Sequence, residues 1–148
     1  MTTRLARALR GRGWQVLTTH HPGAQVGVYV LQSPRPRPAT KGAVVLDLVA
    51  KRGRAYLLVE SKDRYWVADA RKVLRVSTQA AYRESLAERF GVDWAQAPVL
   101  IPGIALPASA RVPAEVPEGV VVVRVTPRGM DVVRGKHKLP GARAGRLG

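Results

Sequence analysis

Three residues whose side chains could form a metal site lie close together in the first half of the chain: Asp47, Glu60 and Lys62. Asp47 interrupts the apolar run at 43–50, and Glu60 lies near the end of the apolar run at 55–62. A carboxylate inside an apolar strand loses hydration, and two neighbouring carboxylates repel each other. A divalent cation removes both penalties, and oxygen ligands suit Mg²⁺ or Mn²⁺. Lys62 could then orient or deprotonate a water on that cation.

The two apolar runs are expected to pair as a β-hairpin. Counting outward from a turn at Arg52 and Gly53 places Asp47 opposite Leu58. Strand side chains alternate, so Asp47 and Glu60 share one face and are diagonal neighbours, roughly 7–8 Å apart at the backbone. Their carboxylates can then reach one cation. Both runs are apolar on both faces, which predicts central strands covered on each side.

The rest of the chain predicts the elements that hold this hairpin. The predicted helices are 3–11 and 78–90, the latter capped by Ser77 or Thr78. The further predicted strands are 14–19, 25–32, 98–106 and 120–126, and 65–76 is mixed, with a short strand at YWVAD. The proline-containing segments 33–42 and 107–119 are expected to be loops. The prediction is therefore one domain over 1–133, followed by a basic, disordered tail over 134–148.

The charge of the chain is strongly positive. It has 25 Lys and Arg against 10 Asp and Glu, a formal net charge of +15. Such a surface attracts polyanions, of which nucleic acid is the commonest, with ribosomal RNA or an anionic membrane as alternatives. The residues expected to contact a nucleic-acid backbone are Arg4, Arg7, Arg10, Arg35, Arg37, Lys41, Lys136 and Lys138.

Composition also excludes several classes of protein. The chain has no cysteine, which rules out disulfides and Cys-ligated zinc. The basic start is not followed by the apolar run of a signal peptide, and no stretch approaches 18 apolar residues. We therefore expect a cytoplasmic protein with no membrane partner.

The run AVVLDLVAKRGRAYLLVESKDRYW at 43–66 resembles the core hairpin of the PD-(D/E)XK, or restriction-endonuclease-like, superfamily. The spacing of its acids and lysine is similar to that of archaeal Holliday-junction resolvases, and the later helix and strands resemble those enzymes and nuclease-related NERD domains. The resemblance implies an α/β fold with a mixed central β-sheet flanked by helices. It also implies that Asp47, Glu60 and the Ser61 backbone carbonyl bind the metal, with Lys62 as the catalytic lysine.

The resemblance further implies an activity for the nuclease-like domain at 1–133. It implies a Mg²⁺-dependent (or Mn²⁺-dependent) endonuclease that hydrolyses DNA phosphodiester bonds by a metal-activated water, on duplex, branched or single-stranded DNA. Gln79 with Tyr82 resembles the Gln…Tyr pair of RecB-type exonucleases, at a spacing one residue shorter, which makes Gln79 a catalytic candidate. By analogy, such an enzyme works as a homodimer.

One departure from the family keeps alternatives open. Many members have a Glu on the first helix as another metal ligand, and the helix at 3–11 has no acid. Either two carboxylates suffice, or His20 or His21 substitutes, or activity is lost. The alternative functions are a catalytically inactive nucleic-acid-binding module of the same fold, and an unrelated basic RNA- or ribosome-associated protein in which Asp47 and Glu60 are only salt-bridged.

Overall fold

The structure is a computed structural model that describes residues 1–19, 29–30, 44–135, 139 and 143–144. The helices are α1 (Thr2–Gly11), α2 (Val67–Thr78), α3 (Ala80–Phe90) and the short 3-10 helix η1 (Trp94–Gln96). The strands are β1 (Gln15–Thr19), β2 (Tyr29–Val30), β3 (Val44–Val45), β4 (Leu48–Arg52), β5 (Ala55–Ser61), β6 (Val99–Pro107), β7 (Val121–Thr126), β8 (Gly129–Arg134) and β9 (Arg143–Ala144).

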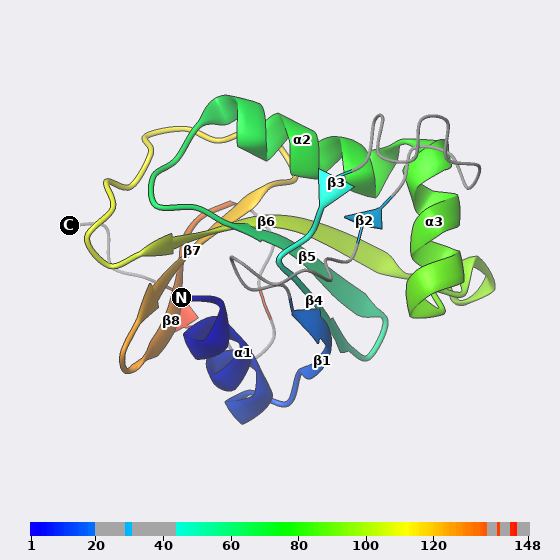
Figure 1. The fold of residues 1–148 in the computed structure, drawn as a ribbon, viewed down its shortest axis with the longest axis horizontal. Coiled ribbons are helices and arrows are strands. Elements are labelled where there is room, and N and C mark those ends of the chain that lie inside the picture. Colours follow the sequence, from blue (N-terminus) through cyan, green and yellow to red (C-terminus); the bar gives the residue numbers. More distant parts are fainter. Residues whose placement is uncertain (20–28, 31–43, 136–138, 140–142, 145–148) are drawn as a thin grey trace.

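Seven of these strands form one mixed sheet in the order β1-β4-β5-β6-β7-β8-β9, and β2 pairs with β3 separately (Figure 1). In the first three strands of the sheet each neighbouring pair is antiparallel (β1 with β4, β4 with β5), whereas β5, β6 and β7 are parallel. The order α1, β1, β4, β5, α2, β6 therefore contains an antiparallel meander followed by a helical crossover to a parallel strand. The predicted α/β class, a mixed central sheet flanked by helices, is confirmed.

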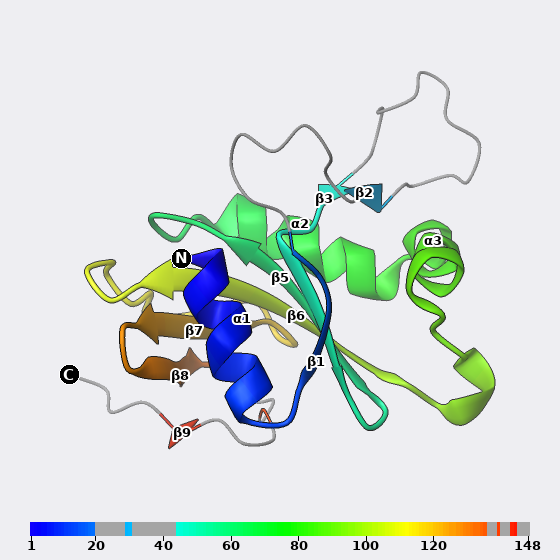
Figure 2. The ribbon, with the colours of Figure 1, turned by 60° about the horizontal axis from the view of Figure 1, so that its bottom comes forward.

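The helices cover both faces of the sheet. Figure 2 shows α1 in front of the strands and α2 behind them. Leu5 and Leu9 of α1 pack against the face that carries Leu57 and Val59 of β5, and Ala70 of α2 packs against the opposite face. Strand β5 is therefore buried on both sides, as its continuous apolar run predicts.

The hairpin turn lies one residue later than predicted. Arg52 pairs with Ala55, so the two turn residues are Gly53 and Arg54. Gly53 has a φ of +59°, at the first position of the turn. A type II′ turn needs this left-handed backbone there, and glycine adopts it without steric cost.

The shifted turn changes the pairing of the acids. Leu48 pairs with Val59 as the last pair of the hairpin, and Leu58 pairs with Val49, so Asp47 lies just beyond the paired residues, next to Glu60. The predicted pairing of Asp47 with Leu58 is wrong by two residues. Strand side chains alternate between the two faces, so a register error of two residues leaves each side chain on its predicted face. The prediction that Asp47 and Glu60 share one face therefore does not depend on the error.

Helix α2 is the main element that the sequence interpretation missed. Residues 65–69 were expected to contain a strand, but a helix runs through Val67–Thr78. The prediction that Ser77 or Thr78 caps the next helix is also wrong, because both hydroxyls donate to the Leu74 carbonyl within α2. Gln79 precedes α3 instead, with no side-chain capping hydrogen bond. Strand β8 was missed as well.

Other predicted elements fall partly outside the described residues. Of the strand expected at 25–32, only Tyr29–Val30 is described. Within 134–148, Leu139 is buried in the core and Arg143–Ala144 pairs with β8. The division of the chain at residue 133 stays a prediction.

Candidate metal centre

The two predicted carboxylates meet where β4 begins and β5 ends. The backbone bends at Asp47, because Leu46 packs on the α2 face and Leu48 on the α1 face. The Asp47 amide donates to the Val59 carbonyl at 2.9 Å, and Asp47 Oδ2 accepts a hydrogen bond from the Ser61 amide at 2.7 Å. Asp47 is thus fixed to β5 on both sides of Glu60.

Glu60 is a buried acid with an unsatisfied oxygen. Its side chain belongs to a residue only 6% exposed, and Oε2 has no hydrogen-bond partner among the described residues. Its other oxygen, Oε1, lies 3.9 Å from Lys72 Nζ. A buried acceptor without a partner is costly, so this oxygen is positioned to gain from any cation or donor that reaches it.

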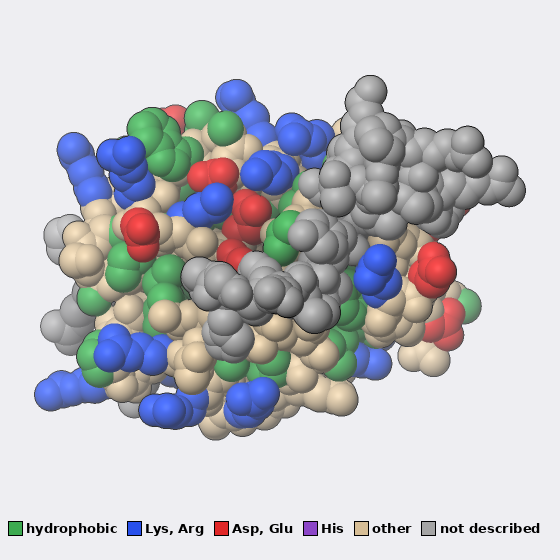
Figure 3. Space-filling model, viewed as in Figure 1, with side chains coloured by type: hydrophobic (Ala, Val, Ile, Leu, Met, Phe, Trp, Pro, Cys, Tyr) green, Lys and Arg blue, Asp and Glu red, His purple; other side chains and the backbone are tan. Residues whose placement is uncertain are grey.

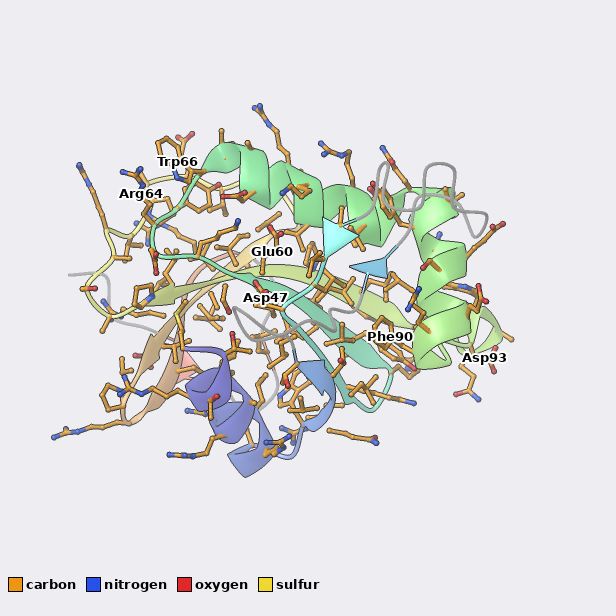
Figure 4. The ribbon with its side chains drawn as sticks, viewed as in Figure 1. Asp47, Glu60, Arg64, Trp66, Phe90 and Asp93 are labelled. Atoms are coloured by element: carbon orange, nitrogen blue, oxygen red, sulfur yellow. The ribbon has the colours of Figure 1, made fainter. Side chains whose placement is uncertain are left out.

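The pKa of Glu60 is raised above its ordinary value of 4.5, chiefly because burial disfavours the charged form. The ammonium groups of Lys72 and Lys62 lower this pKa, while the carboxylates of Asp69 and Asp47 raise it. Glu60 therefore experiences the charges of two other acids at once. Figure 4 shows Asp47 and Glu60 close to one another beside α2.

Helix α2 supplies two charged residues that the sequence interpretation did not include. Asp69 Oδ1 lies 3.5 Å from Lys62 Nζ and 4.0 Å from Lys72 Nζ. Three carboxylates and two ammonium groups therefore form one cluster, visible as the red and blue atoms over α2 and β5 (Figure 3). Asp69 and Lys72 are spaced i, i+3 beside the buried Ala70, which is the helical signal that could have revealed them.

The cluster offers hard oxygen donors, which are the ligands that Mg²⁺ and Mn²⁺ prefer. The unpartnered Oε2 of Glu60 fits such an ion, with Asp47 as the second carboxylate. Within the described ranges, no group of three or more His, Cys, Asp or Glu side chains is arranged to hold a metal. Waters and substrate oxygens would have to complete the shell, which is usual for magnesium.

The structure brings together only some of the predicted site residues. Asp47, Glu60, Ser61 and Lys62 lie at one end of the hairpin. Gln79 is exposed at the junction of α2 and α3, ten residues after Asp69, which corresponds to about 15 Å along a helix. Its catalytic role stays a prediction without support from its position.

The predicted backbone-binding residues divide into two groups. Arg4, Arg7 and Arg10 are exposed on α1. The remaining predicted contacts lie outside the described residues, namely Arg35, Arg37, Lys41, Lys136 and Lys138, as do His20 and His21.

The surface beside the cluster carries an exposed aromatic side chain. Trp66 is 53% exposed at the start of α2, and the Arg64 guanidinium lies 4.6 Å from its ring centroid. Both residues follow Lys62 closely in sequence, and Figure 4 shows them to one side of Asp47 and Glu60.

No known protein family, no curated protein and no solved structure matches this chain. Among the described residues, no helix is long and apolar enough to cross a membrane. The functional argument therefore rests on the site itself.

Proposed function

We propose that the protein is a metal-dependent endonuclease of the PD-(D/E)XK type, which hydrolyses DNA phosphodiester bonds. One observation carries the proposal: Glu60 keeps a buried, unpartnered carboxylate oxygen beside a second carboxylate, Asp47. Structural ion pairs normally satisfy buried acids, so this oxygen favours a ligand-binding role. The mixed sheet and the charge of +15 are compatible with the proposal.

In this proposal Asp47 and Glu60 are both ligands of one divalent cation. Asp47 and Glu60 hold the cation, and the Ser61 amide orients the Asp47 carboxylate through its hydrogen bond of 2.7 Å. Bound Mg²⁺ or Mn²⁺ would supply an activated water and stabilise the negative charge that develops on the phosphate.

The two lysines have distinct roles. Lys62 is about one-third exposed, so its ammonium group can reach a DNA phosphate or the attacking water, and its ion pair with Asp69 orients it. Lys72 lies against Glu60 Oε1 and favours the ionised form of this acid, which is the form that binds a cation.

The test is DNA cleavage in Mg²⁺ or Mn²⁺ on single-stranded, duplex and branched substrates. Glu60→Gln and Lys62→Ala are compared with wild type and with Glu84→Gln, a control that removes an exposed acid from α3. The proposal expects cutting by wild type and the control, and its loss in the two site variants.

The same assay separates the alternatives. DNA binding without cutting in either metal would favour an inactive nucleic-acid-binding module of this fold. No affinity for DNA at moderate salt would favour an unrelated basic protein, with Asp47 and Glu60 serving only in structural ion pairs.

A further inference from the structure

A cavity of about 690 Å³ lies between α1 and the turn that joins β7 to β8. Arginines from both elements line it. The lining arginines are Arg4, Arg7, Arg12 and Arg128. Figure 2 shows α1 alongside the β7–β8 hairpin. This cavity is separate from the carboxylate cluster, because the two sites have no lining residue in common.

The described residues neutralise little of the positive charge of this cavity. The ion pairs between described residues join Lys62 and Lys72 to Asp69 and Glu60, and none of them involves these four arginines. Asp131 is the one acid among the residues that line the cavity. Four guanidinium groups against one carboxylate leave a formal excess of three positive charges, which favours an anionic ligand.

The cavity and the carboxylate cluster lie at the same end of the sheet but on opposite faces, the cavity on the face covered by α1 and the cluster on the face covered by α2. Strands β5, β6 and β7 are parallel, so the carboxyl ends that carry Ser61 and Thr126 point the same way. Strand β7 is two positions from β5 in the sheet, a lateral separation of about 10 Å. Helix α1 joins the two sites, because Thr2 Oγ1 is 3.2 Å from Ser61 Oγ and Arg4 follows within the same turn.

We propose that this arginine-lined cavity binds the DNA backbone on one side of the scissile phosphate and guides the strand to Asp47 and Glu60. The inference rests on the proposed nuclease function and adds to it a second contact site, in which the β7–β8 turn takes part through Arg128. A strand bound in the cavity would pass the start of α1, where Thr2 contacts Ser61, to reach Asp47 and Glu60.

The chemistry of the lining favours phosphate over bases. Guanidinium groups form paired hydrogen bonds with phosphate oxygens. Arg4 and Arg7 are three residues apart on one helix, about 4.5 Å along its axis, so they can contact adjacent phosphates. None of the described residues that line the cavity is a Trp, Tyr, Phe or His, so these residues offer no surface for base stacking. Recognition there is therefore expected to be independent of base sequence.

The test is equilibrium binding of a fluorescent 20-nucleotide strand and a 20-base-pair duplex in EDTA, where no metal-dependent cleavage occurs. The Arg7→Gln/Arg128→Gln variant is compared with Arg75→Gln/Arg89→Gln, which removes the same charge from exposed positions on α2 and α3. The cavity variant is expected to bind at least about tenfold more weakly at 0.1 M salt. A plot of log binding constant against log salt concentration has a negative slope, and in the cavity variant this slope should become shallower by about 1.4 for the strand and by about 1.8 for the duplex.

Two results would overturn the inference. One is an equal loss of affinity in the cavity variant and its charge-matched control. The other is weaker binding of inorganic tripolyphosphate with unchanged DNA binding, which would identify a site for a free phosphate compound. Thermal melting of both variants confirms that they remain folded. The binding readout uses no metal, so failure of the cavity proposal is distinguishable from absence of nuclease activity in Mn²⁺.

Discussion

The backbone amide of Ser61 donates a hydrogen bond to Asp47 Oδ2, and this bond closes the end of the hairpin with a side chain in place of a backbone carbonyl. It forms where the backbone bends between β3 and β4. The same bond orients the Asp47 carboxylate next to Glu60. One residue thus has a structural role and a proposed ligand role, and substitutions can separate the two.

Asp47→Asn and Asp47→Ala are expected to differ in stability but not in activity. Asparagine keeps an oxygen that can accept from the Ser61 amide, whereas alanine leaves this part-buried amide without its acceptor. We expect Asp47→Ala to lose about 1–2 kcal/mol of unfolding free energy relative to Asp47→Asn, measured by urea denaturation. Both should lose metal-dependent cleavage. Equal stability of the two variants would contradict the structural role of this bond.

Glu60→Gln is expected to stabilise the metal-free protein at neutral pH. Because folding raises the pKa of Glu60, the neutral carboxyl is favoured in the folded state. The stabilisation of the folded state by the neutral carboxyl is fully present below pH 4.5, the ordinary pKa, and is lost as the pH rises through the raised pKa of Glu60. Wild type thus carries a cost at neutral pH that the glutamine avoids. Urea denaturation in EDTA should give Glu60→Gln a higher free energy of unfolding than wild type at pH 7, and this difference should disappear near pH 3.5. A difference that does not change with pH would contradict the burial of Glu60 as its cause.

Lys62 and Lys72 are expected to affect cleavage in different ways. Lys62→Ala should lower the cleavage rate by at least about 100-fold at every pH, because its ammonium group acts on the reacting phosphate or water. Lys72→Met removes the charge that most lowers the pKa of Glu60, so the acidic limb of the pH–rate profile should move to higher pH. Profiles measured between pH 5 and 9 distinguish the two effects. Identical profiles for both variants would contradict separate roles.

Gln79→Ala is expected to cleave DNA like wild type, within about twofold. The residue is exposed where α2 ends and α3 begins, about 15 Å along the helix from Asp69. A large loss of activity with unchanged melting temperature would instead support the role that the family resemblance implies.

The hairpin could be predicted from the sequence because its signals are local. Two apolar runs flank a glycine turn, and Asp47 and Glu60 stand out as acids within them. The position of the turn was less predictable, because KRGR has two residue pairs that could form it. The register error of two residues follows from choosing Arg52–Gly53 over Gly53–Arg54.

The contribution of α2 could not be read from the sequence in the same way. Its first residues, Val67 to Asp69, directly follow Tyr65 and Trp66, so the aromatic and apolar run resembles a strand. The helix is instead stabilised by the packing of Ala70 and Val73 against β5 and β6, which the local sequence does not reveal. Because the start of α2 was predicted as a strand, the i, i+3 spacing of Asp69 and Lys72 was not recognised, and their contacts with Lys62 and Glu60 depend on how α2 packs on the sheet.

The central claim is that Asp47 and Glu60 share one divalent cation, and Mn²⁺ binding tests it most directly. Titration followed by electron paramagnetic resonance of free Mn²⁺ counts the ions bound per chain without depending on cleavage. The account predicts one site on wild type and on Glu84→Gln, and its loss in both Asp47→Asn and Glu60→Gln. Mn²⁺ binding that is unchanged in these two variants, or absent from folded wild type, would contradict it.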